Sequence, residues 1–568
     1  MPAFEVNRPV GLSASSDRGA VAAGHPAEVR AGLAMLAEGG NAFDAVVAAA
    51  FMGYVVEPAM CGIGGYGRLS AFHAASGELI SVDHYLRAPA AARPDMFEID
   101  ETKPLKYYET PYTTGLRAEQ GPLAVGVPGA VAGLYWTQRK LGRLAWKTVL
   151  QPAIEAARAG LEVSWSLFLK LAENEVAIRA RPAAAALLLP EGRLPRPSGQ
   201  IEPAERLSLD GLADSLALIA ERGAAGFYEG RLAQAMAEAC RSGGGILSEP
   251  DLANYRPRIL KETPARYRDL DYVTCFDPVG LEALNILDRF DLKSLGADSV
   301  AFRHLMAEAM AAAFVDNIAH YGDPDFGPPG PVAALASRAF GERRAAMLDL
   351  ARALPRPVAA VDPGSGDLGQ ALRPVAADPW PPKLAGTSQM VAADGEGNMA
   401  ALLTSVSASF GAMVAVPGTG ILLNNGMGNF DPRPGRPNSI APGKMPIFAV
   451  PELLAVKDGG AVFAAAGSGG YRITTAILHA FSYWKDFSMP LAEAVAAPRV
   501  HCQGKETYVD ARIDPQVMGG LTKLGHRVVP QLDDPGLNAF GRISAITREG
   551  GRLVAASGPP WAGAAGGL

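Results

Sequence analysis

The sequence reads Gly386-Thr387-Ser388-Gln389-Met390-Val391-Ala392-Ala393-Asp394 where a proline-rich segment ends and an apolar segment begins. Turn-forming residues follow at 394–398, and residues 399–404 are apolar again. Two apolar runs joined by glycine, asparagine and aspartate predict a β-hairpin. We expect this hairpin, whose first strand starts at a hydroxyl residue after a glycine, to be the central element of the fold.

Thr387 stands where a self-cleaving hydrolase would carry its nucleophile, at the mouth of a buried strand. Cleavage of the Gly386–Thr387 bond would give Thr387 a free α-amine beside its hydroxyl group. The pKa of an α-amine is about 7.7–8.0, so this amine can act as general base for its own hydroxyl group at neutral pH. From these residues alone, the plainer interpretation is that a Gly-Thr pair after a loop merely starts a strand.

Longer motifs resemble the small-subunit start of the γ-glutamyltransferase family, the N-terminal-nucleophile (Ntn) hydrolases that cut themselves in two. The matching segments are Thr387 to Asn398, Ser405 to Ser407, Phe410-Gly411 and Gly418 to Asn425. Residues 428–432 and 439–444 are more similar to the branch that includes the class IV cephalosporin acylases. Similar segments recur over nearly the whole chain, beginning with Glu38 to Ala49.

The resemblance implies an α+β fold, a four-layer αββα sandwich with two antiparallel sheets between helical layers. Periodicity alone indicates only mixed α and β structure. The resemblance also implies a large subunit, residues 1–386, and a small subunit, residues 387–568, that build one composite fold. Seven prolines between residues 351 and 386 predict a linker without regular structure before the cleavage site.

Four catalytic groups follow from the resemblance. Thr387 is the nucleophile, and Ser405 stands where the family has a second threonine that hydrogen-bonds the nucleophile. Gly469 and Gly470 occupy the positions of the oxyanion-binding glycines, in a predicted strand-to-helix turn. Backbone N–H groups at a helix start stabilise negative charge, and glycine lets the backbone approach the substrate closely.

The predicted substrate-binding positions differ from those of γ-glutamyl-specific members. Tyr85 stands where those members have an arginine that grips the glutamyl α-carboxylate. Arg87, two residues later, either reaches the same face of a strand or is solvated on a loop. Ser407 replaces an asparagine, Asn429 an aspartate and Phe448 a serine. Losing these partners should cost a zwitterionic substrate several kcal/mol of affinity, which predicts a less polar acyl group.

Composition excludes some classes of function. The net charge of −6 argues against binding to nucleic acid or to an anionic membrane surface, because such partners require an excess of basic residues. We find no signal-peptide pattern in residues 1–24 and no apolar run of membrane-spanning length, so a cytoplasmic location is the default prediction. None of the eight histidines is paired at ligand spacing and the four cysteines are scattered, so no metal or cofactor is predicted.

The leading hypothesis is an autoprocessed N-terminal threonine amidohydrolase or acyltransferase that cleaves a small-molecule amide through an acyl-enzyme. One alternative is a γ-glutamyltransferase or glutathione hydrolase with a rebuilt recognition site that includes Arg87. Another is an unprocessed, catalytically silent binding protein, for which the changes at Gln389 and Ser405 leave room. Sequence does not decide whether a large–small heterodimer pairs further.

Overall fold

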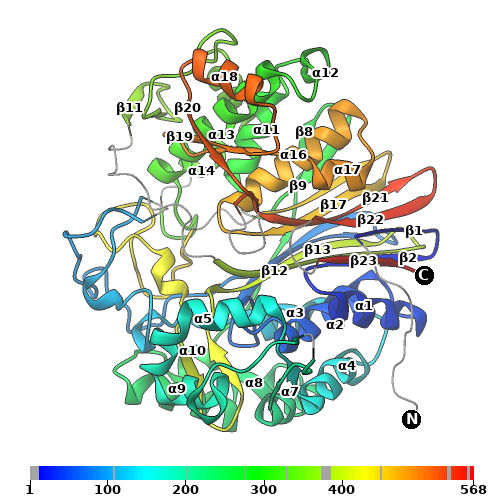
Figure 1. Cartoon of the computed structure of the whole chain (residues 1–568), viewed down its shortest axis with the longest axis vertical. Helices are drawn as coiled ribbons and strands as arrows, with labels where there is room; N and C mark the ends of the chain where they lie inside the picture. The colour runs from blue at the N-terminus through cyan, green and yellow to red at the C-terminus, as the bar shows by residue number, and fades with distance from the viewer. Residues whose placement is uncertain are drawn as a thin grey trace.

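Four layers make up the computed structural model of the chain: helices, sheet, sheet and helices (Figure 1). This arrangement confirms the predicted αββα sandwich. The structure describes residues 12–106, 109–199, 201–275, 277–327, 330–371, 385–447, 451–533, 539–558 and 563–568.

The predicted hairpin lies at the centre of the first sheet. Its strands β12 and β13 pair with Met390 opposite Leu402, and the turn falls at residues 394–398 as expected. All pairs in this sheet are antiparallel. Its order is β23 (Ala564–Gly567), β2 (Gly19–Ala23), β12 (Ala385–Asp394), β13 (Met399–Ala408), β3 (Tyr66–His73), β4 (Glu78–His84) and β7 (Arg258–Lys261).

The second sheet lies against the first and also draws strands from both sides of residue 386. Small and branched apolar side chains, among them Val391, Ala401, Ala464 and Ile546, fill the space between the sheets and are fully buried. The strand order is β1 (Ser13–Ser16), β22 (Arg552–Ser557), β21 (Arg542–Glu549), β17 (Gly460–Ser468), β16 (Glu452–Lys457), β9 (Leu270–Val273) and β8 (Ala265–Tyr267).

The outer face of the first sheet is covered by α1 (Pro26–Ala37), α2 (Ala42–Val56) and α3 (Ala130–Leu141), with α4 (Trp146–Ala159) and α7 (Asp210–Arg222) beyond them. Helix α2 starts with a capping box, in which Asn41 accepts from the backbone and Asp44 bonds back to it. Nearly every residue of α2 is buried, because other helices cover the face that the sheet leaves free.

The second sheet is covered by α16 (Arg472–Phe487) and α17 (Leu491–Ala496), with α11 (Pro278–Leu287) and α13 (Val300–His320) beyond them. The remaining helices are α5 (Trp165–Arg179), α6 (Pro182–Leu188), α8 (Ala225–Tyr228), α9 (Arg231–Ser242), α10 (Glu249–Ala253), α12 (Leu292–Leu295), α14 (Gly330–Leu335), α15 (Arg338–Ala345) and α18 (Pro515–Lys523). Short strands complete the fold: β5 (Leu161–Glu162), β6 (Arg206–Leu207), β14 (Val414–Val416), β15 (Ile421–Leu423), β18 (Val500–Cys502), β19 (Glu506–Asp510) and β20 (Arg527–Gln531).

The prediction of an irregular linker is wrong for part of residues 351–386. Strands β10 (Ala359–Val361) and β11 (Leu368–Ala371) form a small antiparallel hairpin there. Long-range partners stabilise it: the Val361 N–H donates to Asp316 at 2.6 Å and the Val358 N–H to the Gly504 carbonyl at 2.7 Å. Residues 372–384 of the linker lie outside the described residues.

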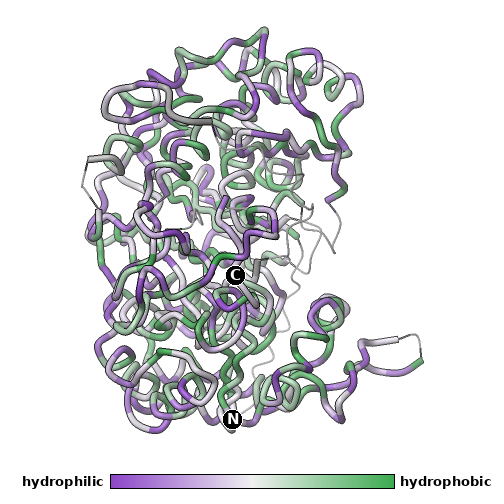
Figure 2. The backbone as a smooth tube through the Cα atoms, turned by 90° about the vertical axis from the view of Figure 1, so that its left-hand side faces the viewer, coloured by the Kyte–Doolittle hydropathy of each residue, from purple (hydrophilic) through white to green (hydrophobic). Residues whose placement is uncertain are grey.

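Hydrophilic and hydrophobic stretches are interspersed along the backbone (Figure 2). Across the described ranges, no helix combines the length and the apolar character that a membrane crossing requires.

Candidate active site

The predicted scissile bond lies inside β12, opposite an irregularity in β13. Gly386 pairs with Ser407 but Thr387 pairs with Ser405, so Val406 is an extra residue in a bulge. Ser407 adopts a φ of 81°, which is uncommon for a residue other than glycine. A Cβ at Gly386 would lie 2.6 Å from the carbonyl of Ala408, so only glycine fits before Thr387.

A chain of hydrogen bonds joins the Thr387 hydroxyl group to the scissile carbonyl. The Ser405 hydroxyl donates to the Gly386 carbonyl at 2.5 Å, and its oxygen lies 3.0 Å from Thr387 Oγ1. Since the one Ser405 proton goes to Gly386, Thr387 is the donor in the second bond. The Ser407 N–H donates to Ser405 Oγ at 2.9 Å and completes its environment. The bulge therefore orients the group that links Thr387 to the bond it is predicted to attack.

The same residues are shielded from water. Thr387 is 2% exposed and Ser405 is 4% exposed in the uncut chain. In such a site a preorganised donor stabilises a developing oxyanion more strongly than it would in water. The arrangement is suited to intramolecular cleavage at Gly386.

Gly469 and Gly470 form the predicted turn between β17 and α16. Their φ values of 127° and 65° favour glycine. Neither of their N–H groups has an acceptor within the part of the chain that the structure describes. Arg542 connects this turn to the predicted nucleophile: its Nε donates to Ser468 Oγ at 2.8 Å and its Nη2 to the Thr387 carbonyl at 3.1 Å.

Three predicted substrate-binding residues, Tyr85, Ser407 and Asn429, come together beside Ser405. The Ser407 hydroxyl donates to Asn429 Oδ1 at 3.1 Å, and Asn429 Nδ2 lies 3.5 Å from the Tyr85 hydroxyl. Sequence reasoning missed Tyr66, whose hydroxyl accepts from Asn429 at 3.2 Å and whose ring lies 4.3 Å from that of Tyr85. Its one sequence signal was an aromatic residue inside the glycine run at 62–67.

Arg87 is held in an ion cluster. Its Nη2 donates to the buried carboxylate of Asp83 at 2.9 Å, and Arg68 and Arg258 approach Asp83 at 3.8 and 4.0 Å. Burial acts to raise the pKa of Asp83, but Arg87 and Arg68 outweigh it and hold the pKa below its usual range. The structure therefore does not support a freely solvated Arg87. Phe448 lies outside the described residues.

The connection at 431–444 folds back onto the polar cluster, which consists of Tyr66, Tyr85, Ser407 and Asn429. Asn438 Nδ2 donates to the Asn429 carbonyl at 2.9 Å, and the Gly443 N–H donates to the Ala88 carbonyl at 3.0 Å. Lys444 Nζ donates to the carbonyls of Pro437 and Ser439 at 2.7 and 2.8 Å. This short connection thus borders the cluster that contains Asn429.

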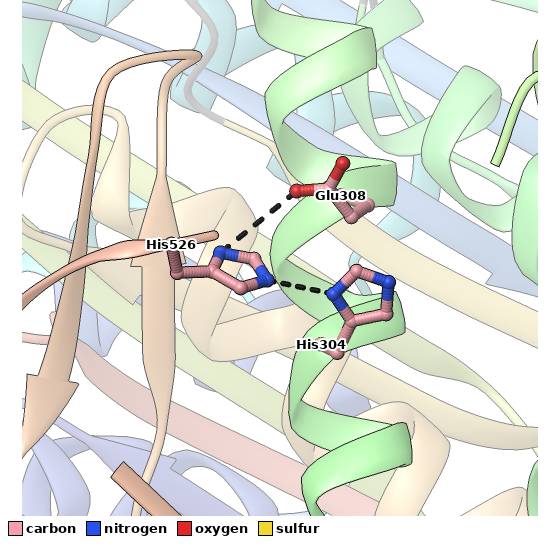
Figure 3. Close-up of side chains that lie close together, drawn as sticks. All are labelled: His304, Glu308 and His526. Carbon is pink, nitrogen blue, oxygen red and sulfur yellow. Dashed lines mark hydrogen bonds and ion pairs between the residues drawn. The ribbon is translucent and has the colours of Figure 1, made fainter. Parts of the chain in front are cut away.

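Three buried potential metal ligands gather elsewhere, where His304 and Glu308 on α13 face His526 (Figure 3). The spacing of the histidines along the chain did not reveal this group, because 222 residues separate His304 from His526. Their rings are joined by a hydrogen bond of 2.7 Å between His304 Nδ1 and His526 Nε2.

Protein groups already use every ring nitrogen in this cluster. His304 Nε2 lies 3.0 Å from the Asp349 carbonyl, which only accepts, so it carries the proton and His304 Nδ1 accepts from His526. His526 Nδ1 accepts from the Thr507 hydroxyl at 2.9 Å. Arg356 is ion-paired with Glu308 and places a positive charge beside the group. The geometry favours a hydrogen-bonded clamp between α13, residues 349–356 and residues 507–526 over a metal site.

A threonine after a glycine in the central sheet of an αββα sandwich, with a hydroxyl partner and a glycine turn nearby, is the arrangement expected of an Ntn hydrolase. A family profile described as gamma-glutamyltranspeptidase matches residues 29–568. The chain belongs to this family.

Two relatives and one solved structure indicate which branch of the family the chain resembles. The "Acylase ACY 1 proenzyme" of Pseudomonas sp. (strain SE83) is 34% identical over 557 residues, which are 96% of this chain and 94% of that protein. The "Glutathione hydrolase proenzyme" of Bacillus subtilis (strain 168) is 29% identical over 515 residues, 90% and 85% of the two chains. The crystal structure of cephalosporin acylase from Bacillus halodurans matches with a TM-score of 0.82 at 26% identity, covering 100% of this chain and 98% of that chain. These matches confirm the resemblance to the acylase branch.

Removing the Ser405 hydroxyl should slow self-cleavage, because the Gly386 oxyanion loses its donor. We expect Ser405→Ala to lower the processing rate by about 10²–10³-fold, and Ser405→Thr, which keeps the hydroxyl, to stay within about 10-fold of wild type. Time courses of precursor loss by intact mass would measure this. Ser409→Ala, a buried serine outside the hydrogen-bond chain, is the control, and wild-type processing of Ser405→Ala would contradict the assignment.

Acidification should weaken the clamp at His526. Burial, aided by Arg356 and His304, lowers the pKa of His526 to about 3, whereas an unfolded histidine titrates near pH 6.5. Between these values the unfolded state binds the extra proton, so the stability that neutral His526 gives is lost as pH falls. The free energy of unfolding of the wild-type protein, measured relative to that of His526→Gln, should therefore fall by about 1–3 kcal/mol from pH 6.5 to 4.5.

Denaturant unfolding of the protein with His526 and of the His526→Gln variant would measure this difference. Both proteins carry Thr387→Ala so that they stay uncleaved. Leu521→Ala is the control, because a cavity beside His526 should destabilise the chain by a similar amount at every pH. A difference between wild type and His526→Gln that does not change with pH would contradict the prediction.

Proposed function

We propose that the chain is an autoprocessed N-terminal threonine amidohydrolase that transfers an acyl group from a small-molecule amide to water or to an acceptor amine. The observation that carries the proposal is the hydrogen-bond chain from Thr387 through Ser405 to the Gly386 carbonyl. The names of the relatives, which include proenzymes of an acylase and of glutathione hydrolases, support self-cleavage.

Self-cleavage begins when Thr387 Oγ1 adds to the Gly386 carbonyl carbon. The Ser405 hydroxyl stabilises the oxyanion on Gly386. The C–N bond then breaks, the Thr387 nitrogen takes the proton that the hydroxyl lost, and an ester joins Gly386 to Thr387 Oγ1. Water hydrolyses this ester and leaves a carboxylate on Gly386 and a free amine and hydroxyl on Thr387.

Turnover reuses the same atoms on a substrate amide. The α-amine of Thr387 removes the hydroxyl proton as Oγ1 attacks the amide carbon, and the N–H groups of Gly469 and Gly470 receive the oxyanion. The leaving amine departs with the proton and the acyl group stays on Oγ1. The α-amine then deprotonates water or an acceptor amine, which takes the acyl group and regenerates Thr387.

The acyl group is proposed to lack the zwitterionic end of a γ-glutamyl group. The cluster beside Ser405 presents neutral hydroxyl and amide groups, from Tyr66, Tyr85, Ser407 and Asn429. Arg87 is engaged with Asp83. The similarity to an acylase proenzyme over 96% of the chain supports the same choice. A cytoplasmic location and further pairing of the heterodimer stay predictions.

One observation favours the alternative, a γ-glutamyltransferase or glutathione hydrolase. Arg87 Nη1 is buried and has no hydrogen-bond partner within the described residues. A substrate carboxylate that reached it would satisfy this donor. The similarity to the Bacillus subtilis glutathione hydrolase proenzyme supports this second candidate.

Replacing Thr387 should keep the chain whole. Divided at Gly386 in proportion to residue count, 59.2 kDa gives fragments of about 40 and about 19 kDa. We expect both fragments by intact mass for wild type, with Thr387 at the new N-terminus, and a single full-length species for Thr387→Ala. A wild-type chain that stays whole through long incubation would instead support a silent binding protein.

The two candidate functions differ in their response to Arg87→Gln. With processed wild type, we expect kcat/KM for a butyryl anilide, which lacks both the carboxylate and the amine of the γ-glutamyl group, to exceed that for the γ-glutamyl anilide by about 10-fold or more, since the neutral cluster gives the zwitterion no charge-assisted contact and each such contact is worth about 1.5–3 kcal/mol. Arg87→Gln should leave this ratio nearly unchanged. A preference for γ-glutamyl that disappears in Arg87→Gln would favour the alternative.

A further inference from the structure

A cluster of charged side chains lies behind the predicted nucleophile and has no place in the mechanism above. Side chains alternate along a strand, so Ser388 points away from the face that carries Thr387. The Ser388 hydroxyl donates to Glu57, and its oxygen lies 3.3 Å from Glu28 Oε1. Glu28 and Ser388 are fully buried, and the Glu57 side chain is 11% exposed.

Two glycines make room for these carboxyl groups. A Cβ at Gly24 would lie 2.8 Å from Ser388 Oγ and 3.0 Å from Glu57 Oε2. A Cβ at Gly53 would lie 2.5 Å from Glu28 Oε1. The backbone therefore leaves the space that both glutamates occupy.

The hydrogen bonds assign one proton to the two carboxyl groups. Ser388 has a single hydroxyl proton and gives it to Glu57, so a bond between Ser388 and Glu28 requires a proton on Glu28. Burial and the nearby Glu57 raise the pKa of Glu28 well above its usual value. Burial also acts to raise the pKa of Glu57, but Arg542, His25 and the Ser388 hydrogen bond together outweigh it and lower that pKa. Glu28 is thus the neutral acid and Glu57 the carboxylate.

Arg542 distributes its contacts over three parts of the fold. Its Nη1 donates to Glu57 at 3.3 Å, at the end of α2. The other two donors reach the Thr387 carbonyl on β12 and Ser468 Oγ, next to Gly469. One buried guanidinium therefore joins the strand of the predicted nucleophile to the predicted oxyanion turn.

We propose that Arg542 and Glu57 are positioning residues: Arg542, anchored by Glu57, fixes the distance between Thr387 and the Gly469–Gly470 turn. Glu28 contributes as a neutral hydrogen-bond donor. This inference rests on the proposed function. Nucleophile and oxyanion donors act on the same carbonyl group, and a misplacement of about 1 Å can cost about 10²-fold in rate.

The experiment compares four variants as processed enzyme, with the fraction processed determined by intact mass. We expect Arg542→Gln to lower kcat by about 10–100-fold while KM changes little, because geometry is lost and not substrate contact. Arg542→Lys should recover part of kcat. Glu57→Gln should lower kcat clearly more than Glu28→Gln, since glutamine resembles the neutral acid.

The matched control is Arg548→Gln. Arg548 also lies on β21 and donates to a backbone carbonyl of β12, that of Asp394 at 2.6 Å, at the end of the strand far from Thr387. We expect its kcat to remain at the wild-type level. Equal effects of Arg542→Gln and Arg548→Gln, or a loss that appears in KM alone, would overturn the inference.

The outcomes also separate this inference from the proposed function. If wild type cleaves itself and an acyl amide while Arg542→Gln behaves like Arg548→Gln, positioning is refuted and the function stands. If wild type neither processes nor hydrolyses any amide, the proposed function fails first. Should Arg542→Gln not fold, the comparison of Arg542→Lys, Glu57→Gln and Glu28→Gln decides.

Discussion

The pairing of β12 on both of its sides is the constraint on which the structure depends. On the C-terminal side of the predicted cleavage point, β12 pairs with β13 from Thr387 to Ala393 and with β2 from Met390 to Asp394. Cutting the chain after Gly386 leaves these bonds in place, so a new N-terminus would stay in the centre of the sheet. A nucleophile held by a sheet keeps the orientation that an amide attack requires, which a flexible terminus would lose.

The early end of β2 leaves one backbone carbonyl of β12 without a strand partner, and a side chain hydrogen-bonds to it instead. The pairing with β2 begins at Met390, opposite Ala23, and the Gly24 N–H donates to the Gln389 carbonyl. Two residues earlier, the Thr387 carbonyl lies beyond that pairing and accepts from Arg542 instead. Since a buried carbonyl is rarely left unpaired, the end of β2 explains why a guanidinium reaches this point. The early end of one strand thus brings a charge beside the predicted nucleophile and requires Glu57 to balance it.

Sequence predicted the parts of the fold that local patterns encode. The β12–β13 hairpin followed from two apolar runs around a turn. The resemblance supplied Thr387 and Ser405, which antiparallel pairing brings together. What sequence missed depends on long-range register. Arg542 is 155 residues from Thr387, and local pattern gives no sign of such a pairing.

The surroundings of Tyr85 give a physical reason for proposing a substrate other than a γ-glutamyl amide. Its hydroxyl faces Asn429, while the guanidinium of Arg68 lies 4.6 Å from its ring centre. The ring therefore separates the polar cluster from the ion cluster around Asp83, where Arg68 and Arg87 are compensated within the protein. A substrate carboxylate that bound those arginines would compete with Asp83 and would also lose its hydration. The Coulomb attraction to the arginines would have to exceed this desolvation cost. Neutral hydroxyl and amide groups impose no such competition, which supports the proposal of an uncharged acyl segment.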